Sequence, residues 1–217
     1  MPQGLVLESL TYSTLQSGPE FATWLDARGP KDVPPDVEPP ILVERDGTAI
    51  HVVLNRPARA NAFIAPMRDA LVEALRTAAA DPSIEGVILR GVGASFCSGG
   101  DLAEFGSVPD PAIGHATRVT RSPAWWVDHL ARDVRVHLHG HCVGAGIELP
   151  AFAGTVLAAE DTRIRLPEVA MGLVPGAGGT VSIPRRIGRH RTAWLAVTGT
   201  EINAVTALRW GLIDRVE

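Results

Sequence analysis

The chain contains little cysteine, few aromatic residues and no excess of basic charge. It has 217 residues, two cysteines, 5% aromatic residues and a formal net charge of −4. Two cysteines do not make a disulfide framework, so we expect Cys97 and Cys142 to be small, reduced core residues. Nucleic acids and anionic membrane surfaces select basic faces, and neither is an expected partner.

Long apolar runs and a secretory leader are also missing. No stretch approaches the roughly 20 apolar residues that cross a bilayer. The first ten residues, MPQGLVLESL, lack a basic segment followed by an apolar one. We therefore expect a cytoplasmic protein, in which the 46% of hydrophobic residues build one sizeable core.

A Pro-rich segment divides the chain. Residues 29–40, GPKDVPPDVEPP, exclude helix and strand and indicate an extended linker. Residues 5–28 before it predict a short helical piece that Gly18-Pro19 interrupts. The predicted organisation is an N-terminal segment with its linker over residues 1–40 and a core over residues 41–217.

Within the core, predicted strands alternate with predicted helices. Two strands, 41–45 and 49–55, are joined by Asp46-Gly47, a strong signal for a two-residue turn. The other expected strands are 87–89, 134–138 and 156–159, and the expected helices are 66–79, 146–153, 181–198 and 203–210. This alternation predicts an α/β fold with parallel strand pairing.

Two glycine-rich turns each follow a buried strand and open a helix. They cover residues 91–101 and 140–148. Such turns expose backbone N–H groups, and two that face each other would form an oxyanion hole. The alternative is that the glycines only permit tight strand–helix packing. Neither turn has the G-x-G-x-x-G spacing or a following Walker lysine, which argues against dinucleotide and nucleoside triphosphate sites.

Five segments, in order, carry one resemblance. They are Asn55–Ala62 (NRPARANA), Ser95–Leu102 (SFCSGGDL), His139–Leu149 (HGHCVGAGIEL), Leu166–Thr180 (LPEVAMGLVPGAGGT) and Thr198–Asp214 (TGTEINA…ALRWGLID). Together they resemble the crotonase superfamily, also called the enoyl-CoA hydratase/isomerase family. The second and third segments are similar to its two oxyanion loops. The resemblance runs from about residue 41 to residue 217.

The resemblance implies a fold, a substrate class and a set of site residues. The implied fold is a spiral of ββα units with parallel sheets and surrounding helices. Family members bind coenzyme A thioesters and stabilise an enolate with two backbone N–H groups, which fall on Ser98 and Ala145. Coenzyme A is then part of the substrate, with no separate cofactor and no metal. The implied substrate-binding residues are Arg56, Ala58, Arg59, Ala60, Ala62, Gly99, Gly100, Asp101, Leu102 and Gly144.

The acid–base equipment separates the members of this family. Hydratases hold water with two glutamates, and this sequence has Glu148 and Glu168 at the matching positions. Adding water to a double bond requires one carboxylate that takes a proton and one carboxylic acid that delivers a proton. Two close, partly buried carboxyls separate into one charged and one neutral form. The alternatives are a helix-dipole role for Glu148 and a surface position for Glu168.

These residues predict an enoyl-CoA hydratase, a lyase of fatty acid metabolism. A double-bond isomerase, which needs one proton shuttle, is the alternative among enzymes. A non-catalytic scaffold with the same fold is the alternative from another class. Pro150 closely follows Glu148 where helix is expected, and this puts the direction of Glu148 in question.

Two groups of side chains carry less specific signals. His137, His139 and His141 share one face of a strand, but no cysteine or carboxylate completes a metal ligand set. Trp125 and Trp126 lie where family members often build the acyl pocket, with core packing or a subunit contact as alternatives.

The N-terminal segment carries a second, shorter resemblance. Family members usually continue past the segment that ends at Asp214 into helices that cover the active site and build a trimer. Residues 8–25 resemble that C-terminal helical region. We expect the N-terminal segment to replace those helices, as in a partial circular permutation, with a flexible leader or a helix that docks elsewhere as the alternatives. A homotrimer or a dimer of trimers is the implied assembly.

Overall fold

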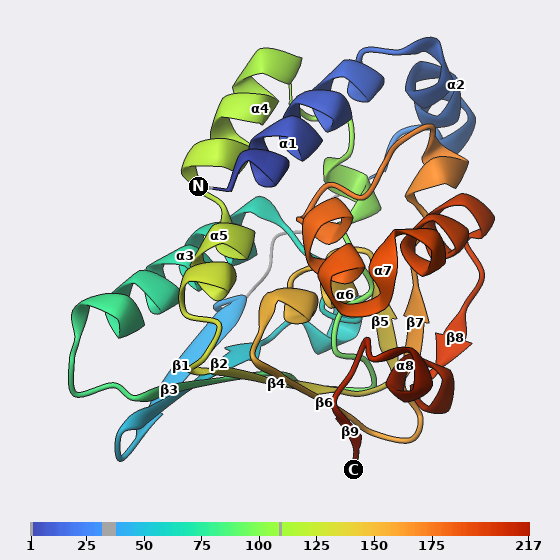
Figure 1. The fold of residues 1–217 in the computed structure, drawn as a ribbon. Coiled ribbons are helices and arrows are strands. Elements are labelled where there is room, and N and C mark those ends of the chain that lie inside the picture. The colour runs from blue at the N-terminus through green and yellow to red at the C-terminus, as the bar shows by residue number, and fades with distance from the viewer. Residues whose placement is uncertain (1, 32–37, 109) are drawn as a thin grey trace.

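A computed structural model describes residues 2–31, 38–108 and 110–217. Its large sheet, within these residues, has the strand order β1-β2-β3-β4-β6-β9 (Figure 1). Only β1 and β2 pair antiparallel, and the other neighbours are parallel. The strands are β1 Ile41–Asp46, β2 Ala49–Leu54, β3 Gly86–Gly91, β4 Val134–Leu138, β6 Thr155–Ala158 and β9 Arg215–Val216.

Local sequence explains the first strands. Gly47 adopts a φ of 58°, which the turn between β1 and β2 requires and which glycine tolerates well. Alternate residues of β2, namely Ile50, Val52 and Leu54, are buried. A smaller sheet has the order β5-β7-β8, formed by β5 His141–Val143, β7 Arg163–Arg165 and β8 Ile202–Asn203.

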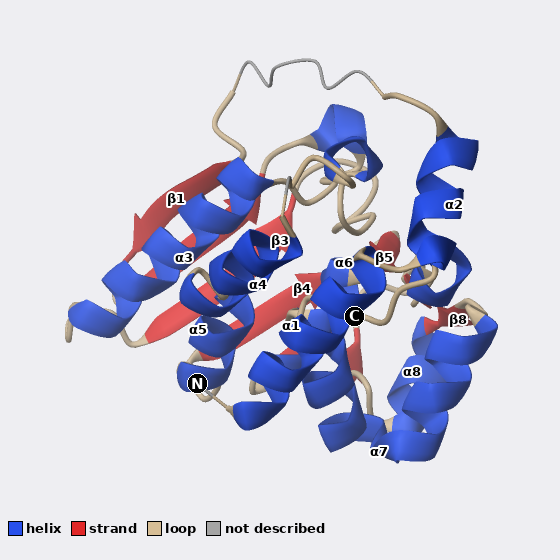
Figure 2. Ribbon diagram, turned by 90° about the horizontal axis from the view of Figure 1, so that it is seen from above, coloured by secondary structure: helices blue, strands red, loops and turns tan. Residues whose placement is uncertain are grey.

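Helices cover one face of the large sheet (Figure 2). The best example is α3 (Ala65–Ala80), which buries Met67, Leu71 and Leu75 against the sheet at helical spacing. The remaining helices of the core are α4 Pro111–Thr120, α5 Pro123–His129, α6 Ala145–Glu148, α7 Gly179–Thr198 and α8 Ala204–Trp210. The architecture is the predicted α/β arrangement of a mostly parallel sheet with surrounding helices.

The N-terminal segment forms two helices, α1 (Gln3–Gln16) and α2 (Pro19–Arg28), separated at Gly18 as expected. Helix α1 packs along α4 and contacts α7 (Figure 1). Helix α2 packs on the short 3-10 helix η4 (Glu168–Met171), where Phe21, Met171 and Leu173 form a small second cluster of buried residues.

Two features of this segment bear on its predicted role. Phe21 is buried, whereas Leu10 is exposed and covers no core surface. Most of the predicted linker, residues 32–37, lies outside the described residues. That this segment replaces C-terminal helices of the family stays a prediction.

Some predicted elements differ in the structure. The helix expected over 146–153 ends at Glu148, because Pro150 has no N–H to continue the hydrogen bonding, and the 3-10 helix η3 (Pro150–Phe152) follows. Helix α7 is interrupted at Gly188, whose φ is 79°. No clear sequence signal marks the short elements β5, β7, β8, α4 and α5. Among the described helices, none combines the length and apolarity that crossing a membrane requires.

Candidate active site

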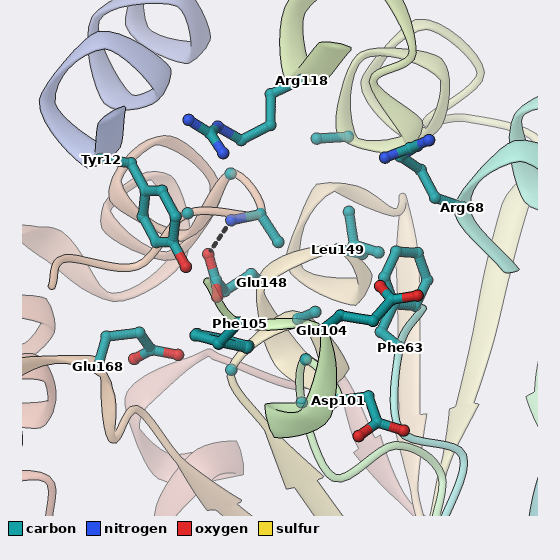
Figure 3. A pocket seen from close by; sticks show the side chains of 18 of the residues that line it. Tyr12, Phe63, Arg68, Asp101, Glu104, Phe105, Arg118, Glu148, Leu149 and Glu168 are labelled. Atoms are coloured by element: carbon teal, nitrogen blue, oxygen red, sulfur yellow. Dashed lines mark hydrogen bonds between the residues drawn. The ribbon is translucent and has the colours of Figure 1, made fainter. Parts of the chain in front are cut away.

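A cavity of about 480 Å³ lies between the two glycine-rich loops and helix α1 (Figure 3). Residues of both loops line it, together with residues of α1, the start of α3, the connection between α4 and α5, and the segment that contains Glu168. The two loops touch: the Cys97 N–H donates to His141 O (3.1 Å), and the Val143 N–H donates to Cys97 O (2.9 Å). The predicted approach of the two loops is therefore present.

Glu148 ends the short helix α6 and lies buried at the cavity wall. Its Oε2 accepts hydrogen bonds from the Ala177 N–H (2.8 Å) and the Gly179 N–H (2.9 Å). Burial raises the pKa of Glu148 well above its usual value, the charge of Glu168 raises it further, and the two N–H donors oppose this rise. Despite Pro150, the side chain of Glu148 points into the cavity (Figure 3).

Glu168 begins the 3-10 helix η4 and is also buried. Within the described part of the chain, its Oε2 is a buried oxygen that has no hydrogen-bond partner. Burial raises the pKa of Glu168 to about 7. A carboxyl in this state is a proton donor or acceptor near neutral pH.

Gly144 shows how close the two carboxyls come. A Cβ added at this residue would lie 2.5 Å from Oε1 of Glu168 and 3.7 Å from Oε1 of Glu148. Gly144 also has a φ of 49°, which favours glycine. Both carboxyls therefore border the same small space, and a side chain at residue 144 would fill it.

The first predicted oxyanion donor is corrected by the structure. The Ser98 N–H donates to Ala60 O at 3.0 Å, so it is already used. Gly100 pairs with Phe63 in a parallel bridge whose hydrogen bonds use the neighbours of Gly100: the Phe63 N–H donates to Gly99 O, and the Asp101 N–H donates to Phe63 O. The N–H of Gly100 therefore points away from Phe63. Among the described residues, no hydrogen bond uses the N–H of Gly100 or of Ala145, and both residues line the cavity. These two N–H groups are the better pair of donors.

Arg56, a predicted coenzyme A ligand, is a buried structural residue. Its guanidinium contacts Asp101 (3.3 Å) and donates to Ala62 O. Arg59 also pairs with Asp101, at 3.2 Å, but 39% of its side chain remains exposed. Arg56 is therefore unsuited to binding a phosphate at the surface, whereas Arg59 remains a candidate.

The other predicted substrate-binding residues fall into two groups. The cavity is lined by Gly99, Gly100, Asp101, Leu102 and Gly144, and also by Ser98. None of the predicted residues from Arg56 to Ala62 lines it. Ala58 is exposed, Ala60 has a left-handed φ of 49°, and Ala62 is buried. Binding of the nucleotide part of coenzyme A along this segment stays a prediction.

Two residues of α1 that sequence reasoning missed also line the cavity, Glu8 and Tyr12. Glu8 accepts hydrogen bonds from the Gly178 N–H (2.6 Å), the Thr180 N–H (2.8 Å) and the Thr180 hydroxyl (2.5 Å). Tyr12 packs over Gly176, and its hydroxyl points toward Glu148 and Glu168 (Figure 3). Their spacing of four residues, which places both on one helix face, was the available signal.

Trp125 and Trp126 contact each other edge-to-face, at 4.3 Å between ring centroids, and border a different hollow. They do not line the cavity that holds the glutamates. The alternating histidines have separate partners: His137 pairs with Glu217 at 3.2 Å, and His139 contacts Gly93 O at 3.0 Å. No group of metal-ligating side chains occurs within the described ranges.

Comparison with known proteins gives a consistent result. A family model described as enoyl-CoA hydratase/isomerase matches residues 44–217. The 2,3-dehydroadipyl-CoA hydratase of Escherichia coli K12 is 33% identical over 178 residues, which cover 81% of this chain and 68% of that protein. The 1,2-epoxyphenylacetyl-CoA isomerase of the same organism is 32% identical over 81% of this chain and 69% of that protein.

Solved structures agree with the sequence relatives. The crystal structure of an enoyl-CoA hydratase from Thermoplasma volcanium has a TM-score of 0.73 and 30% identity, with 83% of this chain and 72% of that chain covered. The chain spans about two thirds of the length of the curated relatives it matches. With its parallel-rich sheet, its two glycine-rich loops and these matches, the chain belongs to the enoyl-CoA hydratase/isomerase family, the crotonase superfamily.

Proposed function

We propose that the protein is an enoyl-CoA hydratase, which adds water to the double bond of a 2-enoyl-CoA or removes it from the 3-hydroxyacyl product. The observation that carries this proposal is the pair of buried carboxyls, Glu148 and Glu168, that border one small space at Gly144. A hydratase needs two such groups, whereas a simple thioester-binding protein needs neither.

The thioester carbonyl oxygen is placed between the N–H groups of Gly100 and Ala145. Adding water at the β-carbon moves the π electrons of the double bond toward this oxygen and forms an enolate. Two aligned N–H donors stabilise this charge, each by about 3–4 kcal/mol. Neither donor is used by another described group, so no existing hydrogen bond must break first.

The two glutamates take different roles because their surroundings differ. Glu148 accepts two backbone N–H bonds, which oppose the rise of its pKa on burial, and in its charged form it takes a proton from the attacking water. Glu168 has an unpartnered oxygen and a pKa raised to about 7, and it gives its proton to the α-carbon. Both border the same space, so water and proton add to one face of the double bond, and the pair then re-equilibrates its proton.

A double-bond isomerase is the second candidate, and one observation favours it. Because Oε2 of Glu148 is held by two N–H donors, Glu168 is the better-placed mobile proton carrier. An isomerase needs only one such carrier, which moves a proton between the α- and γ-carbons of the acyl chain.

Absorbance of the conjugated enoyl-thioester band separates these functions. Hydration of crotonyl-CoA removes the conjugation and lowers the absorbance, as we expect for this protein. Isomerisation of a 3-enoyl-CoA creates the conjugation and raises it. A protein that changes neither signal is a non-catalytic member of the fold, and that result would contradict the proposal.

A further inference from the structure

The cavity has an acidic half and a basic half (Figure 3). Glu148 and Glu168 lie in the acidic half, and Arg68 and Arg118 lie in the basic half, to which Arg121 is linked through Asp69. Asp69 is shared between two of these arginines: it pairs with Arg68 at 2.9 Å and with Arg121 at 2.7 Å. One carboxylate therefore serves two guanidinium groups, whereas the charge of Glu104 acts on Arg68 and that of Glu8 on Arg118 at longer range.

Among the described residues Arg118 forms no direct ion pair, although the charge of Glu8 acts on it at longer range. Its guanidinium donates to the hydroxyls of Ser9 (3.2 Å) and Ser13 and to Oε1 of Gln16 (3.4 Å), and it lies 4.7 Å from the ring centre of Tyr12. All of these partners are neutral. In the described ranges, no acidic side chain lies within ion-pair distance of it.

Helices α1 and α4 hold this guanidinium in one place. It has five N–H donors, and the described contacts use one on each nitrogen, so two donors remain. Arg118 is half-buried and lines the cavity. A fixed, partly desolvated guanidinium with unused donors binds a carboxylate with little loss of side-chain entropy.

The other acidic side chains near the basic half are already used. Glu104, which lies between Phe63 and Phe105 in Figure 3, accepts the Ala65 N–H at 2.9 Å and so caps the start of α3. Asp101 is held by arginines on the far side of its loop. Neither carboxylate takes up the unused donors of Arg118, which face the cavity and are open to the carboxylate of a ligand.

We propose that the basic half of the cavity binds a negatively charged end of the acyl chain, so that the preferred substrates are short 2-enoyl-CoA thioesters that end in a carboxylate. Arg118 is the specificity-determining residue. This inference rests on the proposed function of the cavity as an acyl-CoA site.

A phosphate of coenzyme A offers similar chemistry, but the position of Arg118 favours the acyl chain. Tyr12 contacts Arg118 on one side and packs over Gly176 on the other, next to the turn that donates to Glu148. Arg118 is thus one aromatic ring away from the reacting groups. The segment expected to hold the nucleotide, residues 55–62, lies outside the cavity lining.

The test compares two substrates that differ only in the terminal group of the acyl chain. One is hex-2-enoyl-CoA with a terminal carboxylate, and the other is its methyl ester. We expect the wild-type protein to prefer the carboxylate in kcat/KM by about tenfold to a hundredfold, as charge-assisted hydrogen bonds allow. Arg118→Met should remove the preference by lowering kcat/KM much more on the carboxylate than on the ester, and Arg118→Lys should retain part of the preference. Arg76→Met, at an exposed arginine of α3, is the matched control and should retain the full preference.

Three outcomes overturn the inference. They are a wild-type protein with no preference, an Arg118→Met variant that keeps the preference, and an equal loss on both substrates, which would indicate a structural or phosphate-binding role. If Arg118→Met does not fold, the ratio of the wild-type kcat/KM values on the carboxylate and the ester tests the inference by itself. If neither substrate is hydrated, the proposed function fails, and calorimetric binding of the saturated carboxylate and ester thioesters still tests the anion site.

Discussion

Glu148 and Glu168 are the same residue type in different surroundings. Glu148 is fixed by two backbone N–H groups, and Glu168 has an oxygen without a partner. We predict that Glu148→Gln and Glu168→Gln each lower kcat by about 10²–10⁴-fold, the usual contribution of a general acid or base. Steady-state hydration kinetics measure this, with circular dichroism to confirm folding. Glu73→Gln, at an exposed glutamate, is the control, and near-normal turnover in either active-site variant would refute the two-carboxyl mechanism.

The raised pKa of Glu168 predicts how activity and stability depend on pH. Hydration needs its proton, so kcat should fall as pH rises through about 7. The folded protein also keeps a proton that the unfolded chain releases above about pH 4.5. The free energy of unfolding therefore decreases as pH rises from about 4.5 to 7, by about 1.4 kcal/mol for each unit of pKa difference.

Glu168→Gln removes this dependence. The melting temperature of the variant should exceed that of the wild type by more at pH 8 than at pH 5. Thermal melts at the two pH values measure the difference, and an unchanged difference would mean that Glu168 is charged in the folded protein.

At the scale of one element, the start of α7 is shared by two carboxylates. Glu148 accepts the N–H groups of Ala177 and Gly179, and Glu8 accepts those of Gly178 and Thr180. This alternation satisfies donors that a helix N-terminus leaves without partners, and it ties α1 to α7.

We predict that Glu8→Ala lowers the free energy of unfolding by about 1–3 kcal/mol, because buried N–H groups lose their acceptor. Urea titration measures the change. Glu20→Ala, at an exposed residue in the first turn of α2, should have a much smaller effect. Equal effects of the two substitutions would show that the Glu8 hydrogen bonds do not stabilise the fold.

At the scale of the whole molecule, the N-terminal helices complete the active site. They supply Glu8 and Tyr12 to the cavity and Phe21 to the second cluster. We predict that deleting residues 1–38 lowers the melting temperature and reduces kcat/KM by roughly 10²-fold, since the cavity loses one wall and Glu148 loses its fixed surroundings. Full activity of the shortened chain would contradict this role.

The assembly expected from the family is also testable. Exposed apolar side chains lie along α7 and α8, among them Trp194, Val197 and Val205. We predict a trimer or a pair of trimers, in which such surfaces are covered. Sedimentation at micromolar concentration measures the mass, and a monomer alone would count against the prediction.

Local signals in the sequence were enough to predict much of the framework. The turn at Asp46-Gly47, the helical spacing of Met67, Leu71 and Leu75, and the two glycine-rich turns each act over a few residues, and each appears in the structure. Both glutamates were also identified, because each stands inside a recognisable segment. The sequence alone thus determined the fold class and singled out the two glutamates that the structure brings to one cavity.

The tertiary structure decided what each polar group binds. The Ser98 N–H is used by Ala60, and Arg56 is buried against Asp101, so neither has the role that its place in a motif suggested. Glu8 lies more than 100 residues from Gly178 and Thr180, whose N–H groups it accepts, and Arg118 lies more than 100 residues from Ser9, to which it donates. Only the packing of α1 on α4 and α7 brings these residues to the cavity. Burial and the choice of hydrogen-bond partner depend on contacts between distant segments, which local spacing does not encode.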